Sequence, residues 1–203
     1  APAGGGSPNA IGAAIVGQPV VLQSDALVRS AGATVSFVGA GSDLNALTNA
    51  IRFDAVPGGF VGGILPYATV GWDSNYDAIP ETVDLVADVD PGASFAVGKL
   101  AAYDASNVKV TANTALSGTI NALLIAGNGV TVDTTGGLTI SSGQVVNAGG
   151  SNTLGSGGVA FGAAEPLVFV ESAAALEISG GLAGSGDLRK ERTGTLILNG
   201  DNS

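Results

Sequence analysis

The feature that most constrains the fold of this chain is the recurrence of short apolar clusters separated by turn residues. From about Ser117 onward the clusters recur roughly every seven to nine residues, at 120–125, 130–132, 138–140, 145–146, 159–161, 167–170, 176–178 and 195–198. Gly, Asn and Ser separate them, as in Gly127-Asn128-Gly129. Short apolar runs bounded by such residues are typical of β-strands joined by tight turns.

Three strand-and-turn units give a period of about 20 to 25 residues, the range expected for a repeat architecture. The sequence therefore predicts an all-β fold, a solenoid in which each coil hydrogen-bonds to the next about 4.8 Å away. A β-sandwich is the alternative. Its strands are usually longer and its core richer in aromatic residues, whereas this chain has one Trp, three Tyr and six Phe among 203 residues.

The expected organisation is an N-terminal arm or cap over residues 1–19, followed by the parallel β-helix over 20–203. Strands are expected at 20–22, 33–38 and 50–53, an irregular stretch with a surface loop around 58–90, and regular coils from about 117. The residues expected to form the inward-facing rows are Ile120, Leu123, Ile125, Val130, Val132, Leu138, Ile140, Val145, Leu167, Phe169, Leu176, Ile178, Leu196 and Leu198.

Charge and composition exclude several classes of function. Seven basic against seventeen acidic residues give a formal net charge of -10, which opposes nucleic-acid binding. The absence of His and Cys excludes a Ser-His-Asp triad, a Cys-His dyad and a His- or Cys-ligated metal centre. No apolar run approaches the roughly 18 residues of a membrane-spanning helix. We expect no cofactor.

The C-terminal stretch carries a more specific motif. Its residues follow the pattern G-S-G-x-L-x-K-x-G-x-G-T-L-x-L-x-G-x-N at Gly184, Ser185, Gly186, Leu188, Lys190, Gly194, Thr195, Leu196, Leu198, Gly200 and Asn202. This resembles the autotransporter-associated β-strand repeat of large secreted bacterial proteins. Segments at 26–41, 49–55, 62–71 and 120–133 are similar to sequences that precede the repeat. Arg192 departs from the pattern, which usually has Gly there, so we expect a stiffer or more exposed turn.

The resemblance implies a right-handed parallel β-helix that is exported to the cell surface as part of a much longer protein. The expected role is structural or adhesive, a rigid spacer or fibre segment outside the cell or on the bacterial surface. The expected partners are other copies of the chain, other cell-surface components or glycans. We also expect the coil at 193–198 to present strand edges that pair with another chain.

Sites for chemistry are sparse, and we expect no catalytic residue. The best metal candidate is a calcium loop formed by Asp73, Asn75 and Asp77, continued by Glu81 and Asp84. Ala78 stands at the sixth position, where such a loop requires Gly, so an ordinary Asx-rich turn is the preferred interpretation.

Two alternatives to the structural role stay open. Trp72 and Tyr76 could form an aromatic ledge for a glycan on the loop at 71–77, which would make the chain a glycan-binding module. Parallel β-helices also include polysaccharide-degrading enzymes. The acidic residues of the regular part (Asp133, Glu165, Glu171, Glu177 and Asp187) are spread singly, which disfavours the paired carboxylates of a hydrolase.

Overall fold

The computed structural model describes residues 9–13, 20–73, 82–92 and 94–201, which form strands and turns and no helix. Accordingly, none of these residues belongs to a helix long and apolar enough to cross a membrane. The chain divides into two compact units, Ala1–Ala101 and Ala102–Ser203. Each unit is described by itself.

The second unit is built from fourteen short strands in three sheets. The first sheet contains β10 (Gly118–Ile120), β13 (Leu138–Ile140), β16 (Val159–Gly162) and β19 (Leu182–Gly184). The second contains β8 (Asn107–Val110), β11 (Ala122–Ile125), β14 (Gln144–Asn147), β17 (Leu167–Val170) and β20 (Arg189–Glu191). The third contains β9 (Thr114–Ala115), β12 (Thr131–Asp133), β15 (Ser151–Leu154), β18 (Ala175–Ile178) and β21 (Thr195–Leu198).

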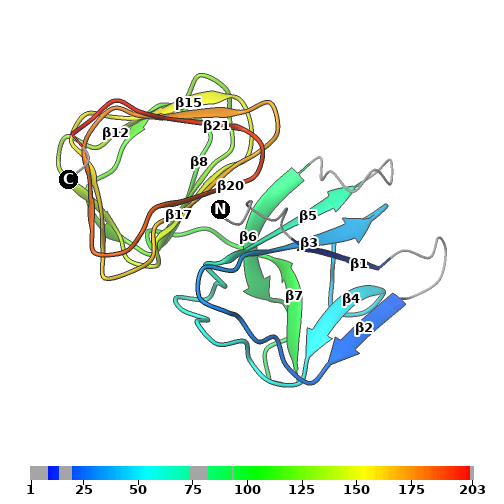
Figure 1. The fold of residues 1–203 in the computed structure, drawn as a ribbon. Coiled ribbons are helices and arrows are strands. Elements are labelled where there is room, and N and C mark those ends of the chain that lie inside the picture. Colours follow the sequence, from blue (N-terminus) through cyan, green and yellow to red (C-terminus); the bar gives the residue numbers. More distant parts are fainter. Residues whose placement is uncertain (1–8, 14–19, 74–81, 93, 202–203) are drawn as a thin grey trace, which may run out of the picture. The chain divides into compact units, whose positions relative to one another are not determined.

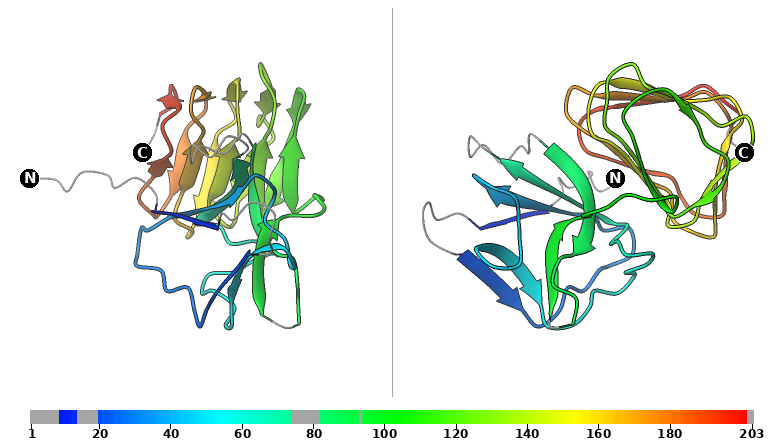
Figure 2. Two further views of the ribbon diagram at one scale, coloured as in Figure 1. Left: turned by 90° about the vertical axis from the view of Figure 1, so that its right-hand side faces the viewer. Right: turned by 180° about the vertical axis from the view of Figure 1, so that it is seen from behind.

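Every strand pair in the second unit is parallel. The chain passes through the three sheets in turn, and each strand pairs with the strand that occupies the same place one pass later, as in Val145↔Val168 and Ile178↔Leu198. Viewed end-on, successive passes follow one three-sided outline (Figure 1). From the side the strands of one sheet lie next to one another in chain order (Figure 2). We call one pass through the three sheets a coil.

Inward-facing rows of Val, Leu and Ile fill the space enclosed by the three sheets. Ten of the residues expected in these rows belong to the buried cluster: Ile120, Leu123, Ile125, Val130, Val132, Leu138, Ile140, Val145, Leu176 and Ile178. Leu196 packs against this cluster and is partly buried. The prediction of a stacked aliphatic core is confirmed for these positions.

The prediction of which β17 side chains point into the core is wrong, because the alternation is shifted by one residue. Val168 and Val170 belong to the buried cluster, whereas Leu167 and Phe169 are buried on the opposite face of the strand. The sequence Leu-Val-Phe-Val is apolar on both faces, so its alternation carries no signal for which face is inward. Leu198, also expected in the core, is 38% exposed because its strand ends a sheet.

The first unit has a different topology. Its strands are β1 (Asn9–Ala13), β2 (Val20–Ser24), β3 (Val35–Ala40), β4 (Asn49–Phe53), β5 (Ala68–Asp73), β6 (Thr82–Asp88) and β7 (Phe95–Lys99), joined in the order β1-β3-β5-β6-β7-β4-β2. The strands expected at 20–22, 33–38 and 50–53 correspond to β2, β3 and β4. β1 lies inside the stretch expected to be an arm or cap and pairs with β3.

Parallel pairs β1–β3, β3–β5 and β2–β4 account for half of this sheet, but β5–β6, β6–β7 and β7–β4 are antiparallel. A continuous parallel winding from residue 20 is therefore not what the first unit shows. For the β6–β7 pair the local cause is the turn between the two strands, where Asp88 Oδ1 accepts the backbone N–H groups of Asp90 and Ala96 at 3.1 and 3.0 Å. The sequence Asp90-Pro91-Gly92 favours chain reversal there, and Gly92 has a φ of 108°.

The core of the first unit is more aromatic than that of the second. The rings of Phe37 and Phe53 lie 6.2 Å apart, and Phe60 meets Phe95 edge-on at 5.3 Å. Arg52 extends from β4 to Asp90, with Nη2 2.9 Å from Oδ2. These four phenylalanine rings thus pack against one another in pairs.

Candidate functional site

The predicted calcium loop is only partly placed. Asp73 ends β5 and is 3% exposed, while Asn75, Asp77 and Glu81 lie outside the described residues. Asp84 lies in β6 opposite Val70, three residues along β5 from Asp73, or about 10 Å away along the strand. The segment is flanked by strands on both sides. Asp73 and Asp84 are therefore not brought together, and the described residues contain no group of three or more Asp, Glu, His or Cys side chains able to hold a metal ion.

The predicted aromatic ledge is also incomplete. Trp72 lies in β5 between Gly39 of β3 and Thr82 of β6, and its side chain is partly buried. Tyr76 lies outside the described residues. Glycan binding by the loop at 71–77 stays a prediction.

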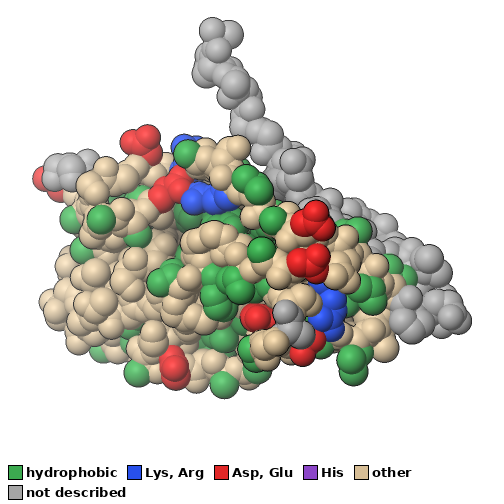
Figure 3. Space-filling view, turned by 90° about the horizontal axis from the view of Figure 1, so that it is seen from below, with side chains coloured by type: hydrophobic (Ala, Val, Ile, Leu, Met, Phe, Trp, Pro, Cys, Tyr) green, Lys and Arg blue, Asp and Glu red, His purple; other side chains and the backbone are tan. Residues whose placement is uncertain are grey.

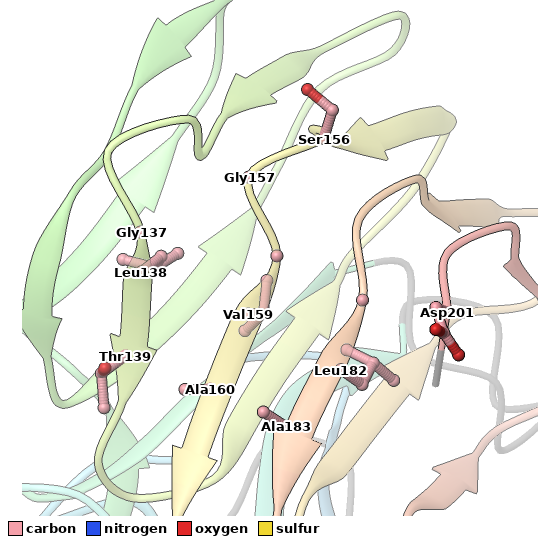
Figure 4. Close-up of a pocket in the computed structure, with 12 residues that line it drawn as sticks. Gly137, Leu138, Thr139, Ser156, Gly157, Val159, Ala160, Leu182, Ala183 and Asp201 are labelled. Carbon is pink, nitrogen blue, oxygen red and sulfur yellow. The ribbon is translucent and has the colours of Figure 1, made fainter. Parts of the chain in front are cut away.

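A shallow groove crosses the outer face of β13, β16 and β19. Its floor is a row of small side chains, Thr139, Ala160 and Ala183, that lie opposite one another on successive strands (Figure 4). Ser156 and Asp201 stand on turns at its rim, and the groove encloses about 420 Å³. One carboxylate and two hydroxyls line this groove, so it lacks the pair of carboxylates that glycoside hydrolysis uses.

Glycines without a Cβ atom allow the backbones of adjacent coils to approach closely. A Cβ atom on Gly194 would lie 2.2 Å from the carbonyl oxygen of Glu171, and one on Gly157 would lie 1.8 Å from that of Thr134. Both distances are far below van der Waals contact. Gly194, one of the glycines of the repeat pattern, is thus required because the backbone of the preceding coil lies so close to it.

The acidic residues of the coil formed by β17 and β18 contact the coil that follows. Glu165 pairs with Arg189, and Glu171 pairs with Arg192. Glu177 Oε1 accepts a hydrogen bond from Asn199 Nδ2 at 2.9 Å. Three of the five carboxylates considered for a hydrolase, Glu165, Glu171 and Glu177, therefore form contacts between coils.

The Glu171–Arg192 pair is the most buried of these contacts. Arg192 Nε lies 3.3 Å from Glu171 Oε1, and the two side chains are 12% and 10% exposed. Burial raises the pKa of the Glu171 carboxyl above its usual value, and the charge of Arg192 opposes this shift. Arg192 has a φ of 69°, in the left-handed region that favours glycine, which accounts for the Gly of the repeat pattern at this position. The expectation of a more exposed turn is wrong, because the guanidinium is buried against Glu171.

Buried asparagines form a polar network that the sequence analysis did not single out. Asn121 Nδ2 donates to Asn107 Oδ1 at 2.8 Å, at the corner between the second and first sheets. Asn152 Nδ2 lies 2.7 Å from Asn147 Oδ1 and 2.8 Å from the carbonyl oxygens of both Gly127 and Gly149. Asn152 Oδ1 accepts the N–H of Val130 at 2.8 Å. The signal in the sequence was an Asn that borders apolar residues, as Asn121 and Asn147 do.

Charged side chains are few on the face shown in Figure 3, where they stand singly or in small groups on a largely uncharged surface. No protein-family model, no curated protein and no solved structure matches this chain. The resemblance to the autotransporter-associated repeat therefore rests on the sequence motif at 184–202.

Proposed function

We propose that the second unit is a segment of a right-handed parallel β-helix of the autotransporter-associated repeat type, with a structural or adhesive role on a bacterial cell surface. The observation that carries the proposal is the parallel pairing of each strand with its equivalent one coil later in all three sheets, in register except for one shift between β16 and β19. Each coil contacts only its neighbours, so such a stack gains length by adding coils, without a new core.

The repeat motif supports the same proposal from its placement. Its glycines at 194 and 200 stand where a Cβ would lie 2.2 Å from the preceding coil's backbone. Its Leu196 and Leu198 continue the rows of Leu176 and Ile178. The pattern thus encodes coil stacking, which suits a spacer and supplies no catalytic group.

A mechanical experiment tests the spacer role. Pulled between residues 102 and 201 in a single-molecule trap, a coiled stack releases one coil at a time, and each coil of about 22 residues adds roughly 75 Å of contour length. We expect a series of such equal steps from residues 102–201. A single step that releases the whole segment at once would contradict coil-by-coil mechanics.

The two alternatives are tested on the same protein. A glycan array that shows binding lost on Trp72→Ala would assign the chain to glycan recognition. Release of reducing or unsaturated sugars from polysaccharides would assign it to the degrading enzymes. An antibody against the chain that labels intact cells of the source organism tests the surface location.

A further inference from the structure

We propose that Asn128 is a site of spontaneous modification, at which attack by the following backbone nitrogen converts the asparagine to aspartate and isoaspartate. This chemistry belongs to one turn, between β11 and β12, and does not depend on the proposed function. Only two asparagines in the chain precede a glycine, Asn128 and Asn199. Glycine has no Cβ to hinder the approach of its own nitrogen to the preceding side chain, so these two are the asparagines to compare.

The reaction needs only water as a co-reactant. The Gly129 nitrogen forms a bond to Cγ of Asn128, and the Cγ–Nδ2 bond breaks, so that the amide leaves as ammonia with the proton that the nitrogen gives up. The resulting succinimide ring then takes up water. Opening of the ring at Cγ gives an ordinary aspartate. Opening at the main-chain carbonyl of residue 128 gives isoaspartate, whose backbone runs through Cβ and Cγ and is longer by one carbon.

Ser151 of the next coil holds both reacting groups. Its N–H donates to Asn128 Oδ1 at 3.0 Å, and its carbonyl oxygen accepts the Gly129 N–H at 2.9 Å. Two bonds to one residue keep the carboxamide and the nitrogen close together, which favours a reaction between them. The Ser151 N–H also donates to the oxygen on which negative charge develops during the attack. The bond from the Gly129 N–H must break, and water replaces it because the turn is exposed.

The leaving group and the ring have room. Asn128 and Gly129 are both exposed, and within the described part of the chain Asn128 Nδ2 donates no hydrogen bond. Gly129 has a φ of 71°, and a Cβ atom built on it would have no neighbour within 4 Å. The amide can therefore leave into water, and the succinimide can form without displacing a neighbouring side chain.

The second Asn-Gly sequence is held more tightly. Asn199 Nδ2 donates to Glu177 Oε1 at 2.9 Å, so its leaving group is bound to a carboxylate of the preceding coil. A Cβ atom on Gly200 would lie 2.2 Å from the carbonyl group of Gly180, so the backbone there has little room to bend into a ring. The fold should therefore slow the reaction at Asn199 and leave Asn128 reactive.

The two products act differently on the coil stack. Aspartate keeps the Oδ1 acceptor for Ser151 and the length of the turn. Isoaspartate lengthens the main chain where the next coil lies against it, since a Cβ atom on Gly150 would lie 2.6 Å from Asn128 Cα. The bond between the Gly129 N–H and Ser151 then loses its register. Modification of one exposed side chain thus weakens the stacking of two coils.

Peptide mapping by mass spectrometry tests the site. The intact chain is incubated in mildly alkaline buffer, folded or in urea, and the loss of each asparagine is followed over time, with an isoaspartate methyltransferase to mark the isoaspartate product. In urea we expect Asn128 and Asn199 to react at similar rates. In the folded chain we expect Asn128 to react about tenfold faster than Asn199, a barrier difference of about 1.4 kcal/mol. Asn128→Gln is the matched control, because its longer side chain closes the larger ring far more slowly; the product at this position should disappear.

Urea unfolding of the aged protein separates the effect of charge from that of backbone length. The isoaspartate fraction should unfold at a lower urea concentration than fresh protein, whereas Asn128→Asp should unfold with the wild type. The proposal is overturned if Asn128 stays intact in the folded chain over a time that consumes it in urea. Equal rates at Asn128 and Asn199 in the folded chain would also overturn it, as would an isoaspartate fraction that unfolds like fresh protein.

Discussion

Replacing Asn152 by aspartate changes one buried group while keeping the shape of the side chain. Asn152 is 3% exposed, and its Nδ2 amide faces three oxygen acceptors, the Gly127 and Gly149 carbonyls and Asn147 Oδ1. An ionised carboxylate donates no hydrogen bond, so Asn152→Asp leaves these acceptors without their donor and adds a charge that they repel. The bond from the Val130 N–H to Oδ1 is retained.

The expected magnitude follows from the number of groups affected. Two donated hydrogen bonds are lost at about 1 kcal/mol each, and each buried group left unsatisfied costs about 1 to 3 kcal/mol. With two acceptors left unsatisfied, we therefore expect Asn152→Asp to lower the free energy of unfolding of the second unit by about 4 to 8 kcal/mol at neutral pH, a large part of the stability of a domain. The assay is urea unfolding followed by far-ultraviolet circular dichroism, with hydrogen exchange to assign the loss to residues 102–201.

The pH dependence and a control identify the cause. Burial among acceptors raises the pKa of the introduced carboxyl above its unfolded value of about 3.9, so the penalty is smallest below that pH and grows as pH rises toward the folded pKa. Asn128→Asp is the control, because Asn128 is exposed and only accepts, from the Ser151 N–H at 3.0 Å. The reasoning is refuted if Asn152→Asp unfolds within about 1 kcal/mol of the wild type at pH 7.

Three further substitutions test the coil contacts. Gly194→Ala should cost about 2 to 4 kcal/mol in urea unfolding, because the new Cβ would lie 2.2 Å from the Glu171 carbonyl oxygen, whereas Gly149→Ala, with no atom within 4 Å of its Cβ, should stay within about 0.5 kcal/mol. Ile140→Asp, at a position with 0% exposure, should cost about 4 kcal/mol or more; thermal melting like that of the wild type would show that the row is misplaced. The raised pKa of Glu171 makes its ionisation unfavourable in the fold, so its contribution to stability is fully present below about pH 4.5 and is lost as pH rises through the folded pKa. As pH rises from about 4.5, the wild type should therefore lose stability relative to Glu171→Gln. A stability difference between the two proteins that does not change with pH would mean that Arg192 fully compensates the burial of Glu171.

The strands and the inward-facing residues of the second unit could largely be predicted from the sequence. Between residues 120 and 178 the apolar clusters are short and the turns are marked by glycine, so strands and inward rows follow directly from the sequence. Where a strand is apolar on both faces, as in Leu167–Val170, alternation does not distinguish inward from outward, and the facing of Phe169 was missed.

The first unit shows the other limit of prediction. Its apolar runs predicted strands at nearly the right places, but strand direction depends on partners distant in sequence and on one turn at Asp88. The buried asparagines were missed for a related reason. A polar residue beside a turn looks solvated in the sequence until an adjacent coil covers it. Asn152 is covered in this way, because the carbonyl of Gly127 in the preceding coil and that of Gly149 in its own coil both lie within hydrogen-bonding distance.

The central claim, that residues 102–201 wind as in-register parallel coils, is tested most directly by scalar couplings across backbone hydrogen bonds in an NMR experiment on the deuterated chain. The structure pairs the amide of Ser141 with the carbonyl of Ile120 at 2.9 Å, that of Thr153 with Val130 at 2.8 Å, and that of Ser179 with Leu154 at 2.9 Å. We predict a coupling for each of these pairs, every one joining residues a single coil apart. Couplings from these amides to carbonyls of antiparallel neighbours, or to carbonyls of adjacent hairpin strands, would contradict the account.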